Sequence, residues 1–124
     1  MNKLSKFARR SIKNRDCEIF LWYEKDSDEL VAQMTLENGD SDTWINSVFV
    51  SPRYRKQGLS YALLEVATVL GGTRLAVRKC NTKALHAYKK FGFEIFDEND
   101  KFYFMRLRTD IESASRAEIL GKEK

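Results

Sequence analysis

The 124-residue chain contains one proline, one histidine and two cysteines, and it has no long apolar run. Cys17 and Cys80 are too few for a disulfide framework, so the reducing cytoplasm is the expected setting. No apolar run reaches the length of a membrane span, and no charged leader precedes an apolar segment. We therefore expect neither a membrane-spanning helix nor secretion, and we expect no metal site.

Basic residues are unevenly distributed along the chain. Residues 1–15 hold six of the 22 lysines and arginines and no acidic residue, whereas the other 109 residues carry 16 basic and 18 acidic groups. Leu4, Phe7, Ala8 and Ile12 follow helical spacing, so residues 3–14 are predicted to form a helix. This basic arm either covers the sheet with its apolar stripe or contacts nucleic acid or another polyanion; a transit peptide has a similar composition.

The rest of the chain alternates between strand and helix patterns, without a sign of a second domain. Asn38-Gly39 is a hairpin signal, and Gly71-Gly72 suits the end of a helix. The predicted strands are 17–23, 29–36, 43–50, 73–77, 93–96 and 102–107, and the predicted helices are 59–70, 82–90 and, in a tail of residues 109–124, 110–120. A helix joins strands 43–50 and 73–77, so these two are parallel. The sequence predicts one α/β domain over residues 1–124, with a mixed sheet and a central parallel pair.

Residues 48–62 join a buried strand, a basic loop with one glycine and the start of an amphipathic helix. Arg53, Arg55 and Lys56 precede Gly58, and the helix begins at or just after that glycine. The first amides of a helix have no partner within it and carry partial positive charge, which favours a phosphate. Ligands of such sheets bind at the carboxyl ends of parallel strands, so this loop predicts an anion site. An ordinary turn with solvated charges is the alternative.

Two motifs resemble the GNAT acyltransferases, which bind acetyl-coenzyme A. Residues 55–60 (RKQGLS) resemble the family's pyrophosphate loop, Q/R-x-x-G-x-G/A, with Ser60 in place of glycine or alanine. Residues 81–93 fit N-x-x-A-x-x-x-Y-x-x-x-G-F, which the family places downstream of that loop. The resemblance spans residues 43–107 and implies a GNAT-like sheet with a splayed central parallel pair, flanked by helices. The chain is shortened at its N-terminus, where one arm replaces two helices.

The resemblance implies acetyl-CoA as the cofactor, held by the anion loop and by the splayed strand. Backbone N–H groups of Phe49 or Val50 would polarise the thioester carbonyl. Asn81 resembles the family's cofactor-contacting asparagine, and it also suits the N-cap of the helix that follows. The predicted cofactor-binding residues are Val48, Phe49, Val50, Arg55, Lys56, Gln57, Gly58, Leu59, Ser60, Asn81 and Tyr88.

Tyr88 is the predicted catalytic residue. It resembles the family's tyrosine that gives its proton to the leaving thiolate, and a phenol of pKa about 10 suits a thiolate of pKa about 8.5. The alternative for Tyr88 is a core aromatic on the helix face shared with Ala84 and Leu85.

The general base is the open part of this mechanism. Asn46 stands where many GNAT proteins carry a glutamate, and an amide cannot take a proton. A water relay, or an acceptor that arrives deprotonated, would take its place. His86 as a base and Cys80 as an acyl carrier are further candidates, although no partner that lowers the cysteine pKa is evident.

The acceptor site is predicted from the last hairpin turn. Asp97, Glu98 and Asp100 would attract a cationic amine there, together with Asn46; a solvated turn is the alternative.

The resemblance implies an N-acetyltransferase that moves an acetyl group from acetyl-CoA to a primary amine, by direct attack in a ternary complex. The alternatives are a catalytically idle CoA-binding module that acts through a protein or nucleic-acid partner, and a ribosome- or nucleic-acid-associated protein led by the basic arm. The acceptor, a small molecule or a protein, stays open, and we expect a monomer or a homodimer.

Overall fold

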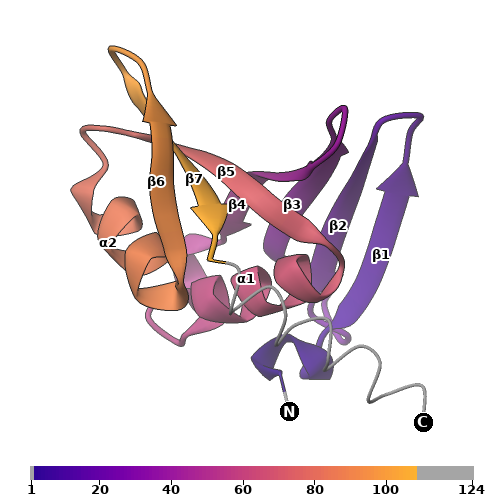
Figure 1. Cartoon of the computed structure of the whole chain (residues 1–124). Coiled ribbons are helices and arrows are strands. Elements are labelled where there is room, and N and C mark those ends of the chain that lie inside the picture. Colours follow the sequence, from indigo (N-terminus) through magenta and orange to yellow (C-terminus); the bar gives the residue numbers. More distant parts are fainter. Residues whose placement is uncertain (1, 109–124) are drawn as a thin grey trace, which may run out of the picture.

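A seven-stranded mixed sheet forms the body of the computed structural model, which describes residues 2–108 (Figure 1). The strands lie in the order β1-β2-β3-β4-β5-β7-β6. β4 and β5 are parallel, and every other neighbouring pair is antiparallel. The elements in chain order are η1 (Lys3–Lys6), β1 (Ala8–Lys13), β2 (Cys17–Tyr23), β3 (Leu30–Asn38), β4 (Thr43–Val50), η2 (Pro52–Tyr54), α1 (Leu59–Val69), β5 (Gly72–Arg78), α2 (Thr82–Phe91), β6 (Phe93–Glu98) and β7 (Phe102–Leu107).

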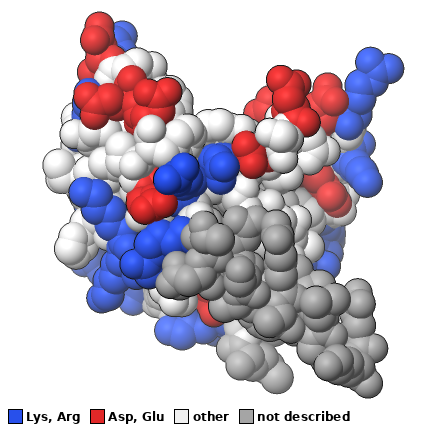
Figure 2. Space-filling model, in the orientation of Figure 1, with Lys and Arg blue, Asp and Glu red and all other residues white. Residues whose placement is uncertain are grey.

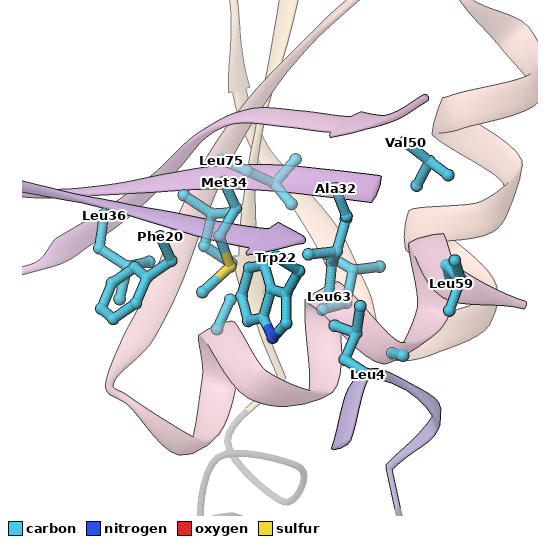
Figure 3. Packing of buried hydrophobic residues seen from close by; sticks show 14 of the residues in the cluster. Leu4, Phe20, Trp22, Ala32, Met34, Leu36, Val50, Leu59, Leu63 and Leu75 are labelled. Atoms are coloured by element: carbon cyan, nitrogen blue, oxygen red, sulfur yellow. The ribbon is translucent and has the colours of Figure 1, made fainter. Parts of the chain in front are cut away.

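The predicted α/β fold is confirmed, with a single mixed sheet and a parallel pair within it. α1 packs against the sheet through apolar side chains that recur at helical spacing, and Leu63 and Ala67 are fully buried. Figure 3 shows Phe20, Trp22 and Met34 directed from the sheet into the same core. α2 flanks β5 and β6, and Tyr61 of α1 contacts Phe91 of α2 with 5.0 Å between ring centroids. The core thus fixes α1 against the carboxyl half of β4. The tail predicted to be helical lies outside the described residues.

The helix predicted over residues 3–14 is wrong. The structure has a single 3₁₀ turn, η1, followed by β1, which pairs with β2 along its whole length from Ala8↔Tyr23 to Lys13↔Glu18. Pairing with the next strand in the chain overrides the local helical pattern, because apolar residues at these positions satisfy both periods. Leu4 is buried as predicted, whereas Ile12 is 54% exposed on β1. The segment therefore contributes part of the core and one outer strand.

β4 separates from β5 halfway along its length. Their parallel pairing ends at Ile45↔Leu75, and the antiparallel register with β3 shifts at the same place. Ser47 there adopts a left-handed conformation with φ of 54°, within a bulge that adds one residue to β4. A bulge bends its strand and re-aims the side chains that follow, so it accounts for the separation. Within residues 2–108, the edge of β4 that faces β5 has no strand partner from Asn46 onward.

No helix within residues 2–108 combines the length and the apolar character needed to span a membrane.

Candidate active site

A cleft of about 730 Å³ lies at the carboxyl end of β4. The end of the strand forms one wall, the loop and the first turn of α1 form the floor, and a lysine from α2 closes the far side. The lining residues are Val48, Phe49, Val50, Tyr54, Arg55, Lys56, Gly58, Leu59, Ser60 and Lys83. The cleft therefore lies where the parallel strands part, which is the usual ligand position in sheets of this kind.

The loop that enters α1 is curled by two residues with positive φ, Lys56 at 63° and Gly58 at 80°. Gly58 is the N-cap residue of α1, and no side chain caps this end of the helix. The amide groups of the first turn have no intrahelical partner, and the helix dipole adds partial positive charge. This end of α1 can therefore take an anion into the cleft.

The basic residues of the loop have different surroundings. Arg53 forms an ion pair with Glu29 at 2.9 Å and does not line the cleft, so it is turned away from the site. Arg55 lines the cleft, donates from Nε to the carbonyl oxygen of Val50 at 2.9 Å, and lies over the Phe49 ring at 5.8 Å. The Arg55 guanidinium thus braces the end of β4. Among the lining residues, Lys56 and Lys83 supply the remaining cationic side chains.

Tyr88 lies on α2 and is half-buried, with its ring edge-on to Phe93 at 6.4 Å between centroids. Burial raises the pKa of the phenol, because the charged form is poorly solvated there. Within residues 2–108 its hydroxyl has no protein hydrogen bond, and no side-chain oxygen or nitrogen is both buried and unpartnered. The Tyr88 hydroxyl therefore reaches solvent-accessible space and keeps its proton at neutral pH.

Asn81 caps α2, as its place before that helix suggested. Its Oδ1 accepts a hydrogen bond from the Ala84 amide at 3.2 Å. The cleft lining includes neither Asn81 nor Tyr88, although it does include Lys83 from the turn between them.

The predicted acceptor residues lie at two separate places. Asn46, on β4, donates from Nδ2 to Glu37 Oε2 on β3 at 2.6 Å. At the end of β6, Glu98 pairs with Lys79 at 3.3 Å, and Asp97 accepts from the Glu98 amide. Asp100 lines a shallow hollow of its own, formed with Asn99, Lys101 and Phe102. Figure 2 shows acidic side chains gathered at the tips of the hairpins and basic side chains over α2.

The sequence model of the Acetyltransferase (GNAT) family matches residues 2–93, about three quarters of the chain. The chain belongs to this family. No curated protein sequence matches it significantly.

Solved GNAT-type structures share the fold of this GNAT chain at low sequence identity. A PaiA N-acetyltransferase from Thermoplasma acidophilum in complex with coenzyme A is 19% identical, with a TM-score of 0.62 over 75% of this chain and 61% of that one. The Campylobacter jejuni N-acetyltransferase PseH in complex with acetyl coenzyme A is 20% identical, with a TM-score of 0.59 over 77% and 70%. A chimera of Vibrio cholerae spermidine N-acetyltransferase SpeG and hSSAT is 13% identical, with a TM-score of 0.68 over 89% and 99%. The chain thus spans only about three fifths of the Thermoplasma protein.

The residues predicted to bind the cofactor lie partly in the cleft lining and partly outside it. The lining includes Val48, Phe49, Val50 and the loop residues other than Gln57. The backbone carbonyl oxygen of Gln57 accepts a hydrogen bond from Lys3 Nζ at 3.1 Å. Motif spacing carries no signal for Lys3, Lys83 or Glu37, because each reaches its place through tertiary contacts. Cys80 and His86 are exposed and do not line the cleft.

Proposed function

We propose that the chain is an acetyl-CoA-dependent N-acetyltransferase that acylates a primary amine. The observation that carries this proposal is the cleft itself, in which an uncapped helix start meets a strand that has left its parallel neighbour. Acetyl-CoA, when bound, supplies an activated acetyl thioester. The amides of residues 58–60, with Lys56 and Lys83, would hold its phosphates, and the free edge of β4 at residues 48–50 would hold its pantetheine arm.

Tyr88 is the group that would return a proton to the leaving sulfur. Its raised pKa keeps the phenol protonated at neutral pH, and its hydroxyl has no competing protein partner within residues 2–108. A phenol is also acidic enough to protonate an alkyl thiolate as the carbon–sulfur bond breaks.

Glu37 is our candidate for the group that receives the proton of the amine. Asn46 cannot take a proton, but it holds the Glu37 carboxylate where β4 begins to leave β5. Within the described part of the chain, Glu37 forms no ion pair with a basic side chain, so its negative charge is available to an ammonium group. An acceptor that arrives as an ammonium would pass one proton to Glu37, directly or through a water, and thereby free its nitrogen lone pair for attack.

One observation favours a second candidate, a GNAT-fold module that binds coenzyme A without catalysis. The β4 position that often carries a glutamate in this family is Asn46, and the carboxylate beside it comes from another strand. Such a module would retain the cleft and its affinity for the cofactor but would act through a partner.

Incubation of the protein with acetyl-CoA and a panel of amines, followed by detection of free thiol, tests the proposal. The panel includes spermidine, since a spermidine N-acetyltransferase shares the fold, and peptides with a free lysine or a free N-terminus. We expect amine-dependent thiol release. Binding of acetyl-CoA without release for any amine would support the idle module, and a protein that does not bind acetyl-CoA would overturn both.

A further inference from the structure

The amino-terminal segment of residues 2–7 is docked onto the loop that enters α1. Asn2 donates from Nδ2 to the Ala62 carbonyl oxygen at 3.1 Å, which anchors the segment to the first turn of the helix. Leu4 is 2% exposed within the core, and Phe7 lies edge-on to Tyr54 with 5.9 Å between ring centroids. Three contacts spread over six residues hold this part of the basic arm in one place.

Docking places the Lys3 ammonium against the phosphate-binding loop. Lys3 Nζ donates to the Gln57 carbonyl oxygen at 3.1 Å, and a Cβ added to Gly58 would lie 2.7 Å from the same nitrogen. An ammonium has three N–H donors, and the hydrogen bond to Gln57 uses one of them. The other two are free for a ligand, since Lys3 forms no ion pair within residues 2–108.

Beside Lys3 lies a second hollow of about 440 Å³ that adjoins the main cleft at Leu59. Asn2, Lys3, Ser5, Lys6, Gln57 and Leu59 line it. Lys6 Nζ lies 5.2 Å from the Phe7 ring centroid, and this lysine also has no acidic partner in the described part of the chain. The hollow is thus lined by two cations and three neutral polar residues. The carboxylate nearest to this lining in the hydrogen-bond network is that of Glu65, which accepts from Asn2 Nδ2 at 3.3 Å and is not itself a lining residue.

Five of the six charges of the basic arm therefore form two groups, and the sixth, Arg15, follows β1. Lys3 and Lys6 face the hollow, whereas Arg9, Arg10 and Lys13 belong to β1, where Arg10 pairs with Asp28 at 3.3 Å. Arg53, which precedes the loop in sequence, is engaged with Glu29 instead. Lys3 thus supplies a positive charge at the loop that Arg53 does not.

We infer that the hollow binds the 3′-phosphate of coenzyme A, so that the amino-terminal segment is part of the cofactor site; this rests on the proposed function. Coenzyme A carries its pyrophosphate between the pantetheine arm and the nucleotide, and the 3′-phosphate lies at the nucleotide end. The hollow shares Leu59 with the cleft, so a nucleotide that leaves the cleft past the start of α1 would reach Lys3 and Lys6. Two ammonium groups match a phosphate monoester, which carries nearly two negative charges at neutral pH.

Calorimetric titration with coenzyme A and with 3′-dephospho-coenzyme A tests the inference without any acceptor. The wild type should bind coenzyme A about tenfold or more tightly, which is the effect of one charge-assisted hydrogen bond. The double variant Lys3→Met and Lys6→Met should lose this preference while its affinity for the dephospho ligand stays unchanged. The control Lys13→Met with Lys25→Met removes the same charge from exposed positions elsewhere and should keep the preference.

Lys3→Arg with Lys6→Arg retains both charges and should also retain the preference, which separates charge from packing. Equal affinity of the wild type for the two ligands, or a preference that survives the double methionine variant, would overturn this inference and leave the proposed function standing. If the wild type binds neither ligand, the proposed function fails and the inference fails with it.

Discussion

The two α-helices within residues 2–108 begin in opposite ways, although each follows the carboxyl end of one of the two parallel strands. α1 starts at Gly58, which has a φ of 80° and no capping side chain. α2 starts at Asn81, whose side chain accepts a hydrogen bond from the Ala84 amide. One helix start is thus left open to a ligand, and the other is closed by the protein itself.

The difference shows how one architecture separates binding from chemistry. An open start leaves donors and partial positive charge for an anion, and it forgoes only about a few tenths of a kcal/mol of capping stability, because glycine is itself a favourable N-cap residue. A capped start gives a helix that is complete without a ligand, which suits α2 as the carrier of Tyr88. Each helix can therefore be altered separately, and the predictions below do so in order of decreasing effect.

Gly58→Asp should abolish the function of the open helix start. The new carboxylate would repel a phosphate and pair with Lys3, so affinity for acetyl-CoA should fall by about 100-fold or more, as charge-assisted contacts each contribute about 1.5–3 kcal/mol. Calorimetry measures the loss. Gly71→Asp is the matched control: it also introduces aspartate at a positive-φ glycine, with φ of 100°, but at the other end of α1 and in open space. Equal binding by the two variants would show that α1 does not receive the phosphates.

Tyr88→Phe should impair the chemistry of α2 and leave binding intact. Loss of a general acid lowers turnover by roughly 100-fold or more, whereas affinity for acetyl-CoA should change little. Steady-state kinetics and calorimetry separate the two. Tyr61→Phe removes a hydroxyl from an exposed tyrosine on α1 and should be neutral. Unchanged turnover in the Tyr88 variant would assign this residue to the core alone.

Asn81→Ala should open the closed helix start and reduce the free energy of unfolding by about 1 kcal/mol, which is the typical contribution of an N-cap. Urea denaturation measures the change. Asn81→Asp retains a capping oxygen and should restore the stability. A variant with alanine that unfolds at the same urea concentration as the wild type would mean that the cap contributes nothing here.

The pH dependence of turnover should show the smallest effect. Burial raises the pKa of Tyr88 above its ordinary value of 10.0, so the folded protein holds this proton more tightly than the unfolded chain does. The corresponding stabilisation is present below pH 10 and is lost as the pH rises through the folded pKa. Turnover should therefore show no decline assignable to Tyr88 below pH 10. A decline in that range that disappears in Tyr88→Phe would contradict this.

The local pattern of apolar and turn residues was sufficient to predict many of the strands and helices. The strands at 17–23 and 43–50 have the predicted bounds, and α1 begins directly after the glycine that the loop motif identified. β1 was mistaken for a helix because its apolar spacing fits either period, and only pairing with β2 decides between them. Short-range signals are reliable where glycine or a hairpin turn accompanies them.

The parts of the site that sequence could not predict depend on register and docking. Asn46 meets Glu37 because the antiparallel pairing of β3 and β4 brings the two side chains together across the strands. Lys3 reaches Gln57 across more than fifty residues of sequence only because Leu4 is seated in the core beside it. The bulge at Ser47 could not be predicted from the sequence, because the residue with positive φ there is not a glycine. Such contacts follow from the assembled fold, and no single stretch of sequence contains them.

β1 also affects how this sheet can meet other copies of the protein. Among the strands of residues 2–108 it is the outermost on its side of the sheet, and outer strands can pair with a strand of another chain. Arg9 and Lys13 are exposed along it and form no ion pair within residues 2–108. Two copies that met through β1 would oppose these like charges, which disfavours symmetric sheet extension and the aggregation that begins with it.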